Sequence, residues 1–325
     1  MSSGRLVLGT RGSALALVQT HLVRAAIRQA HPRLLVEERI IKTSGDKQSH
    51  ASLSRSGVKG LFIKEMEEAL LRGRIDAAVH SLKDMPVSLP AGLCLGAVGK
   101  RSDACDVLVG HSGTNVHDPK TVHTSSPRRV LQARLLWPAC EVCEIRGNVE
   151  TRLRKIAEGT PGEAVLLAAA GLERLDFLHG DGEAGALRFD PPLPYRRLSL
   201  REMIPAPGQA AIAVEIRSDD PETAERIKAL DHAPTRSAVT AERAFLKELG
   251  GGCATPIAIH GRVTHEGLTI TAIVGLPGRK IWRGEKTGAR REAEPLGRAL
   301  ALECRAALGL EPGSIPTIQT SITPP

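Results

Sequence analysis

Aromatic side chains are scarce in this sequence. The 325 residues include two Trp, one Tyr and four Phe. Proteins that bind unpaired nucleic-acid bases stack them on aromatic rings, so this scarcity argues against such a role. It also means that the core must be built mainly from Leu, Val, Ile and Ala. Six cysteines are too few for a disulfide scaffold in a chain of this length.

Long apolar segments are lacking as well. The longest apolar run, Ala164 to Leu172, is about half as long as a segment that crosses a bilayer. Near the N-terminus, the apolar stretch Leu6 to Leu8 is too short for the core of a signal peptide. We therefore expect a protein with no membrane partner, located in the reducing cytoplasm.

The chain carries a moderate excess of positive charge. The 44 Lys and Arg residues against 36 Asp and Glu leave a net charge of +8. Nucleic acid or a small polyanion would each suit such a chain. The basic residues are scattered as singles and pairs rather than gathered in a tail or a basic helix. The distribution favours local sites for small anions, and we expect no nucleic-acid partner.

Strand and helix signals alternate along the first two hundred residues. Residues 6–8, 75–79, 107–109 and 165–168 predict buried strands, and helical patterns lie between them. Alternation of this kind is typical of βαβ units and of a mainly parallel sheet. From about Glu222 onward the pattern changes to short antiparallel strands and a closing helix, which predicts a smaller α+β domain.

Two of the predicted helices have an apolar face. The first begins at Ser13 as N-cap, and its predicted buried face consists of Leu15, Val18, Leu22 and Ala26. The second ends at Gly73, and its predicted face consists of Phe62, Met66, Ala69 and Leu70.

Arginine recurs at predicted helix starts. Arg128 and Arg129 follow Ser126 and Pro127, a capping serine and a proline at the first helical position. Cations at that place face the positive end of the helix dipole, which is unfavourable. The conflict disappears if an anion binds there to the backbone N–H groups and both guanidinium groups.

The same arrangement occurs twice more. Arg146 and Arg152 flank an Asn cap between a strand and a helix, and Arg11 lies in the first strand-to-helix turn before Ser13. A single arginine of this kind would be a solvated surface residue. Three cases in one chain indicate anion sites.

Lys83 and Asp84 follow the predicted strand 75–79 and precede Pro86. In open α/β sheets, ligands bind beyond the carboxyl ends of the strands, so the pair is placed for chemistry. The alternative is a surface ion pair of little energetic value.

The cysteines differ in setting. Cys253 follows a run of three glycines, which indicates an open loop where a bulky covalent group would fit. Cys140 and Cys143 form a single CxxC pair, for which a zinc site and plain strand cysteines are the two interpretations. We favour strand cysteines and expect no metal.

Taken together, the ordered motifs resemble those of the porphobilinogen deaminase family, from about Leu6 to the closing helix. They are Gly9–Leu17, Gly60–Glu65, Asp76–Pro86, Thr124–Arg129, Arg146–Arg152, Ala206–Gln209 and Gly251–Cys253. The chain departs from the family pattern at three positions. His123 and Ala210 stand where the family usually has Gly, and Cys105 stands where a basic residue is common.

The resemblance implies a fold. Two α/β domains like those of periplasmic binding proteins would face each other across a cleft, and a third, smaller α+β domain would carry the cofactor cysteine. The implied domains are residues 1–101 with 201–221, residues 102–200, and residues 222–325. The return to the first domain would account for the late strand Ile212 to Ile216.

The resemblance also implies an activity. The family is a transferase, hydroxymethylbilane synthase, that joins four porphobilinogen molecules on a covalent dipyrromethane primer and releases hydroxymethylbilane for tetrapyrrole synthesis. Asp84 and Lys83 would be the catalytic residues. The cofactor would be bound by Cys253 through a thioether and by Asp84, Lys83, Arg128, Arg129 and Ser126. The substrate carboxylates would be bound by Arg11, Ser13, Ser81, Arg146, Arg152 and Arg174.

Two rival functions remain at this level. A non-catalytic anion receptor of the same two-domain fold would need neither Cys253 nor a third domain, and a nucleic-acid-binding protein is favoured only by net charge. The family resemblance further implies a monomer.

Overall fold

The computed structural model describes residues 4–42, 63–251, 255–276 and 280–311. Within this part the chain divides into two units. Unit 1 comprises Met1–Arg101 and Ala211–Arg236, and unit 2 comprises Ser102–Ala210 and Ser237–Pro325. The three-domain division given above stays a prediction.

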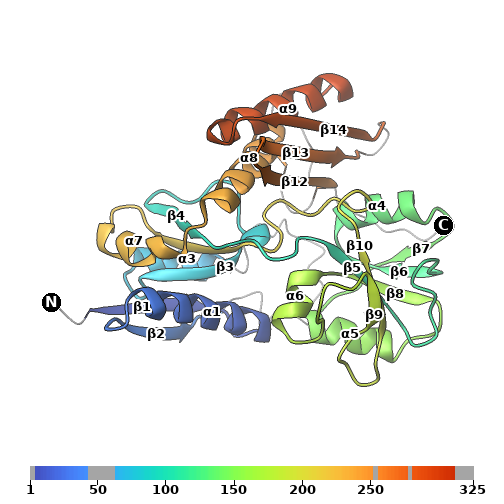
Figure 1. The fold of residues 1–325 in the computed structure, drawn as a ribbon, viewed down its shortest axis with the longest axis horizontal. Coiled ribbons are helices and arrows are strands. Elements are labelled where there is room, and N and C mark those ends of the chain that lie inside the picture. Colours follow the sequence, from blue (N-terminus) through green and yellow to red (C-terminus); the bar gives the residue numbers. More distant parts are fainter. Residues whose placement is uncertain (1–3, 43–62, 252–254, 277–279, 312–325) are drawn as a thin grey trace. The chain divides into compact units, whose positions relative to one another are not determined.

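Unit 1 is built on a five-stranded sheet with the strand order β2-β1-β3-β11-β4. Figure 1 labels four of these strands, β1, β2, β3 and β4. Strand β1 pairs in parallel with both β2 and β3, and only β11 runs against its neighbours β3 and β4. The strands are β1 (Arg5–Thr10), β2 (Leu35–Ile40), β3 (Ala77–Ser81), β4 (Leu93–Val98) and β11 (Ile212–Arg217).

Helices cover both faces of this sheet. Leu6 and Leu8 of β1 contribute to a core with α1 (Ala14–Ala30) and α7 (Pro221–Ile227), while Val7 points to a second core with α3 (Lys64–Leu71). Because both faces are buried, successive strand residues are apolar rather than alternating. The result is three layers, helix, sheet and helix.

The buried face of α1 differs from the predicted one. Leu22 is 49% exposed, and the helix buries Gln19, Thr20, Val23 and Ile27 instead. The prediction was wrong because it counted only apolar residues. Thr20 donates its hydroxyl to the Ala16 carbonyl at 2.9 Å, so its side chain can be buried without an unsatisfied polar group. In α3, by contrast, Met66, Ala69 and Leu70 are buried as predicted, while Phe62, the fourth residue of the predicted face, lies outside the described residues.

Unit 2 contains a six-stranded mixed sheet with the order β7-β6-β8-β5-β10-β9. Strands β6, β7 and β8 are parallel, whereas β5, β10 and β9 pair antiparallel. Its strands are β5 (Asp106–Gly110), β6 (Thr121–His123), β7 (Glu141–Cys143), β8 (Glu163–Ala168), β9 (Ala184–Ala186) and β10 (Pro194–Leu198). The core on one face involves α4 (Pro127–Leu136), and that on the other involves α5 (Val149–Ala157) and α6 (Ala169–Arg174).

The C-terminal part forms a separate antiparallel sheet of β12 (Ile257–Thr264), β13 (Gly267–Val274) and β14 (Trp282–Gly288). Two helices accompany it, α8 (Ala233–Leu249) and α9 (Ala293–Leu308), and the ring of Phe245 on α8 stacks on that of Trp282. The predicted fold class, two α/β sheet–helix parts and a smaller α+β part, is confirmed. The first sheet is mainly parallel as predicted, and the second is mixed.

Candidate functional site

One group of predicted residues meets at a single edge of the unit 1 sheet. Strands β1 and β3 are parallel neighbours, so their carboxyl ends lie at the same edge. Arg11 and Ser13 follow β1, and Lys83 and Asp84 follow Ser81 at the end of β3. The tertiary structure therefore brings together two motifs that are about seventy residues apart in the chain.

A hydrogen-bonded pair joins the two turns. The side-chain amide of Gln19 on α1 donates to the Ser81 hydroxyl at 2.9 Å, and the hydroxyl lies 3.1 Å from the Gln19 carbonyl oxygen. Ser13 accepts from the Ala16 N–H at 3.4 Å, which confirms it as the N-cap of α1. Gln19, which is 3% exposed, was missed by the sequence analysis; its signal was a polar residue directly after the apolar run Ala14–Val18.

Asp84 lies in a short 3₁₀ turn whose neighbours are buried. Leu82 and Met85 are 2% and 4% exposed, and the Leu82 N–H donates to the Ala211 carbonyl at 3.0 Å. Between these anchors the Asp84 carboxylate is exposed, and it accepts no hydrogen bond from the described residues. A fixed backbone with an available carboxylate is the arrangement that charge stabilisation needs.

A second group of predicted residues meets at one edge of the unit 2 sheet. Strands β6, β7 and β8 are parallel neighbours, and each leads from its carboxyl end into a helix. The residues at these strand-to-helix connections and on the helices that follow are Ser126, Arg128, Arg129, Arg146, Arg152 and Arg174. This is the edge at which ligands bind in open α/β sheets.

Arg128 and Arg129 are not solvated surface residues. Their exposed fractions are 4% and 6%, and both bind the fully buried carboxylate of Asp106 at the start of β5, at 2.6 and 2.7 Å. The side-chain amide of Gln209 also donates to Asp106, at 3.0 Å. The counter-anion that the helix start required is therefore supplied in part by the chain itself.

One carboxylate pairs with two guanidinium groups, so Asp106, Arg128 and Arg129 together carry a net positive charge. Burial alone would raise the pKa of Asp106, but Arg128 and Arg129 outweigh it and hold that pKa well below its ordinary value. Burial lowers the pKa of Arg128, against the raising effect of Asp106. The aspartate is thus ionised at neutral pH, and one cationic charge is left without a counter-ion among these three residues.

Arg128 and Arg129 also have N–H groups that lack a hydrogen-bond partner among the described residues. Each guanidinium has five N–H groups, of which three have partners in Arg128 and two in Arg129. The Nε atoms of both residues are buried without a hydrogen-bond partner among the described residues. Buried polar groups without partners are costly, so this donor set fits a ligand that brings carboxylates.

Neither Asp106 nor Gln209 was assigned a role from the sequence. The signal for Asp106 was an acidic residue directly before the buried run Val107 to Val109, where a charge needs a partner. Gln209 belongs to the Ala206–Gln209 motif, but nothing in the sequence indicates that its amide reaches Asp106.

The predicted cap of α4 needs a correction. Ser126 is at the N-cap position and Pro127 follows it, but the Ser126 side chain makes no capping hydrogen bond. The Ser126 N–H donates to the Thr124 hydroxyl at 3.2 Å instead, and the Ser125 hydroxyl donates to the Ile145 carbonyl. The Ser126 hydroxyl is therefore not used by the helix.

The turn before α5 behaves as predicted. Asn148 caps the helix by accepting from the Thr151 N–H at 2.8 Å. Gly147 has a φ of +121°, a conformation that favours glycine. Arg146 is half exposed and binds Glu144, and the Arg152 Nε donates to the Gly147 carbonyl at 2.8 Å.

Arg174, at the end of α6, contacts a residue that departs from the family pattern. Its guanidinium donates to the Ala210 carbonyl at 2.6 Å and to the Ser102 hydroxyl at 3.3 Å. Burial lowers the pKa of Arg174. Ala210 has a φ of +70°, in the left-handed region where glycine is favoured.

We expect the Ala210→Gly variant to be more stable than the natural chain, by up to about 1.6 kcal/mol. The left-handed conformation costs an L-residue about 1–2 kcal/mol, and the greater freedom of glycine in the unfolded chain offsets about 0.4–1 kcal/mol of that gain. Urea unfolding monitored by circular dichroism measures the difference. Ala211→Gly, at the next residue, has no such strain to relieve and should be destabilising. A less stable Ala210→Gly variant would contradict the argument.

Five of the six cysteines lie in the described part of the chain and are free thiols. Burial raises the pKa of every one: to about 12 in Cys105 and Cys304, to about 11 in Cys140, and upward in Cys94 and Cys143. A raised pKa disfavours the thiolate, which is the nucleophilic form. Cys253, the sixth, lies outside the described residues.

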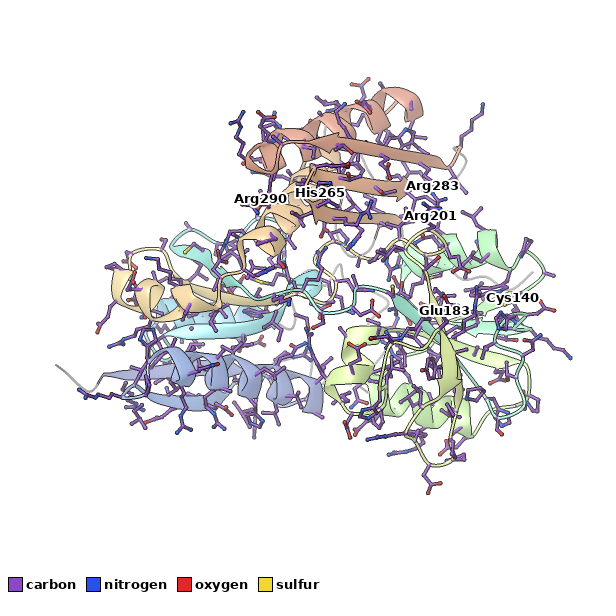
Figure 2. All side chains as sticks on the ribbon, in the orientation of Figure 1. Cys140, Glu183, Arg201, His265, Arg283 and Arg290 are labelled. Atoms are coloured by element: carbon purple, nitrogen blue, oxygen red, sulfur yellow. The ribbon has the colours of Figure 1, made fainter. Side chains whose placement is uncertain are left out.

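The CxxC pair shows no metal-site geometry. Within the described residues, no group of three or more His, Cys, Asp and Glu side chains could hold a metal ion. Cys143 belongs to β7, and Cys140, labelled in Figure 2, precedes that strand and contacts the Glu141 carbonyl through its thiol. In the same described part, no helix has the length and apolar character required to cross a bilayer.

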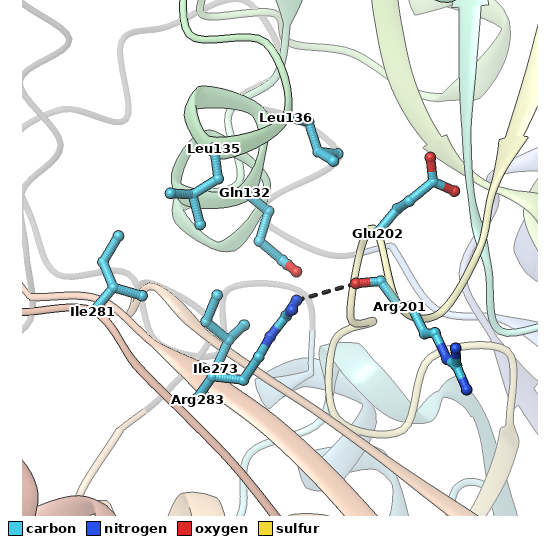
Figure 3. Close-up of a pocket in the computed structure, with 8 residues that line it drawn as sticks. All are labelled: Gln132, Leu135, Leu136, Arg201, Glu202, Ile273, Ile281 and Arg283. Carbon is cyan, nitrogen blue, oxygen red and sulfur yellow. Dashed lines mark hydrogen bonds between the residues drawn. The ribbon is translucent and has the colours of Figure 1, made fainter.

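A pocket of about 450 Å³ lies in unit 2, and none of the predicted site residues lines it (Figure 3). Arg283 enters it from β14 and donates to the Arg201 carbonyl at 3.1 Å. Its lining residues are Gln132, Leu135, Leu136, Arg201, Glu202, Ile273, Ile281 and Arg283. No predicted arginine of the strand edges is among them.

The fold and the site define a mixed α/β protein with cationic strand-to-helix turns, a class that includes both anion receptors and enzymes. Comparison with known sequences narrows the class. The family model described as "Porphobilinogen deaminase, dipyromethane cofactor binding domain" matches residues 6–225, and that described as "Porphobilinogen deaminase, C-terminal domain" matches residues 237–306. The chain belongs to the porphobilinogen deaminase family, a family of transferases with a dipyrromethane cofactor.

Two porphobilinogen deaminases of known sequence agree with this assignment. The porphobilinogen deaminase of Syntrophobacter fumaroxidans is 41% identical over 300 residues, which cover 91% of this chain and 93% of the relative. That of Moorella thermoacetica is 44% identical over 298 residues, covering 90% and 91%. Among solved structures, full-length BenM is similar with a TM-score of 0.40 and 19% identity, over 70% of this chain and 68% of BenM. Family membership decides between enzyme and anion receptor in favour of the enzyme.

Proposed function

We propose that the protein is a hydroxymethylbilane synthase, which couples four porphobilinogen molecules head to tail on a dipyrromethane primer and releases linear hydroxymethylbilane by hydrolysis. The observation that carries the proposal is the match of the cofactor-binding family model to residues 6–225. That range contains every predicted site residue except Cys253.

Asp84 is proposed as the catalytic carboxylate. When bound, the primer supplies a nucleophilic pyrrole α-carbon. In each cycle the C–N bond of porphobilinogen breaks, ammonia leaves with the electron pair, and a cationic azafulvene remains. Asp84 stabilises that cation and accepts hydrogen bonds from pyrrole N–H groups. Asp84 would also accept the proton that is released when the new C–C bond forms. The exposed carboxylate on a fixed turn supports this role.

The basic residues are proposed to bind carboxylates. Each porphobilinogen carries one acetate and one propionate, and a charge-assisted hydrogen bond contributes about 1.5–3 kcal/mol. Lys83, Ser126, Arg128 and Arg129 would bind the cofactor, and the buried Nε–H groups of the arginine pair support that assignment. Arg11, Ser13, Ser81, Arg146, Arg152 and Arg174 would bind the substrate.

Cys253 is proposed as the attachment point, through a thioether that does not exchange. The raised pKa values of the other five thiols support it by elimination, because a nucleophilic thiolate is disfavoured at each of them. A permanent tether keeps the growing chain on the protein between additions.

The intact mass of the purified protein tests the function. We expect an excess over the sequence mass equal to two linked pyrrole units, located on the peptide that contains Cys253. Addition of porphobilinogen should then give species heavier by successive pyrrole units. Protein without the excess, which porphobilinogen neither loads nor extends, would refute the proposal. We also propose that the protein acts as a monomer in the cytoplasm, which gel filtration and cell fractionation would test.

A further inference from the structure

We propose that Asp106 is the positioning residue of the arginine pair: it orients both guanidinium groups and cancels one of their two charges, so that the pair presents a single net positive charge to a cofactor carboxylate. This inference rests on the proposed function. It concerns a residue that touches the arginines and not the reacting atoms.

The geometry places the Asp106 carboxylate between the two arginines. Its Oδ2 accepts from Arg128 at 2.6 Å, and its Oδ1 accepts from Arg129 at 2.7 Å. Each arginine is further held by a backbone carbonyl, Ile204 for Arg128 at 2.9 Å and Leu166 for Arg129 at 2.8 Å. Two fixed contacts on a planar guanidinium leave it little freedom to rotate, so its remaining N–H groups have a set direction.

Gln209 holds the carboxylate in turn. Its amide nitrogen donates to Asp106 at 3.0 Å and to the Ala104 carbonyl at 2.7 Å, and its oxygen lies 3.4 Å from an Arg128 nitrogen. The turn that carries Gln209 is itself fixed, because the Gly208 N–H donates to the buried carboxylate of Glu242 at 2.7 Å. Gln209, which belongs to a second segment of the chain, thus also fixes the position of the Asp106 carboxylate.

A neighbouring ion-pair group has the opposite ratio of charges. Arg197 binds both Asp103 and Glu173, so one guanidinium is matched by two carboxylates and no positive charge is left over. At Asp106 the ratio is reversed, with two guanidinium groups for one carboxylate. Burying an unmatched charge is costly unless a ligand pairs with it. The reversed ratio therefore points to an incoming anion.

Four full-length variants test the role: Asp106→Asn, Asp106→Glu, Gln209→Met, and Asp103→Asn as the matched control. For each we measure folding by circular dichroism, the primed fraction by intact mass, and KM and kcat for porphobilinogen. We expect folded Asp106→Asn protein to show an at least tenfold loss in primed fraction or in kcat, with KM within twofold of wild type. Asp106→Glu, which keeps the charge, should recover part of the loss. Asp103→Asn should be primed and active like wild type.

The outcomes separate the two proposals. Wild-type priming and kcat in folded Asp106→Asn protein would overturn the positioning role and leave the proposed function intact. If Asp106→Asn does not fold, Gln209→Met decides: a tenfold lower kcat at unchanged KM supports positioning, and a wild-type kcat overturns it. Wild-type protein that is neither primed nor active would instead defeat the proposed function itself.

Discussion

The Asp84→Asn variant is expected to keep its primer and to bind porphobilinogen, but to lose most turnover, with kcat lower by about 10²- to 10⁴-fold. Asparagine has the size of aspartate but carries no charge, so it cannot stabilise a cation or accept a proton. The Asp84 side chain is exposed and accepts no hydrogen bond from the described residues, so the substitution should leave the fold intact. Single-turnover kinetics with porphobilinogen, together with intact mass, measure both parts of the expectation.

The control for this variant is Asp219→Asn. Asp219 is also an exposed aspartate of unit 1, but it follows β11, which runs antiparallel to β3 and so ends at the opposite edge of the sheet. We expect wild-type kcat in the control. Normal turnover in Asp84→Asn would refute the catalytic role of that carboxylate, whatever the control shows.

The Cys253→Ser variant is expected to lack the mass excess of two pyrrole units and to form no hydroxymethylbilane. A serine hydroxyl is far less acidic than a thiol and is a poor nucleophile at neutral pH. Without a tether, an elongating chain would leave the protein between additions. The measurement is intact mass before and after incubation with porphobilinogen, followed by assay of the released bilane.

Cys140→Ser provides the matched control, because the Cys140 thiol is partly accessible and burial raises its pKa to about 11. We expect this control to carry the primer and to turn over normally. A primed Cys253→Ser protein, or an unprimed Cys140→Ser protein, would contradict the assignment of Cys253 as the attachment point.

In the proposed function, the pair Arg128 and Arg129 would contribute to both stability and binding. Asp106 makes the burial of Arg128 and Arg129 tolerable, since each guanidinium then has an anionic partner within 2.7 Å. It does so incompletely, because the pair keeps one unmatched charge and buried N–H groups. A fully matched pair would fold as well but would have no use for a ligand carboxylate.

Much of the fold could be predicted from local patterns. Helix α4 begins at Pro127 as predicted, Asn148 caps α5, and β11 coincides with the predicted late strand Ile212 to Ile216. Local patterns failed where a polar residue is buried with its own partner. Gln19 and Thr20 occupy the inner face of α1 for that reason, and Leu22 is left exposed.

For the candidate site, too, the features that depend on local sequence could be predicted. Residue types, the strand-to-helix turns and the order of the motifs follow from the chain alone, because capping, helix dipoles and strand-end positions are local properties. They were enough to identify Arg128 and Arg129 as anion-binding candidates and the family to which the chain belongs.

Only the tertiary structure decided which residues meet. Parallel pairing of β1 with β3 carries Arg11 and Asp84 to one sheet edge, and antiparallel pairing of β5 with β8 carries Asp106 to the edge where Arg128 and Arg129 begin α4. Gln209 joins them from about a hundred residues away in the chain. Such partnerships depend on strand order and direction, which are long-range properties that no local pattern encodes.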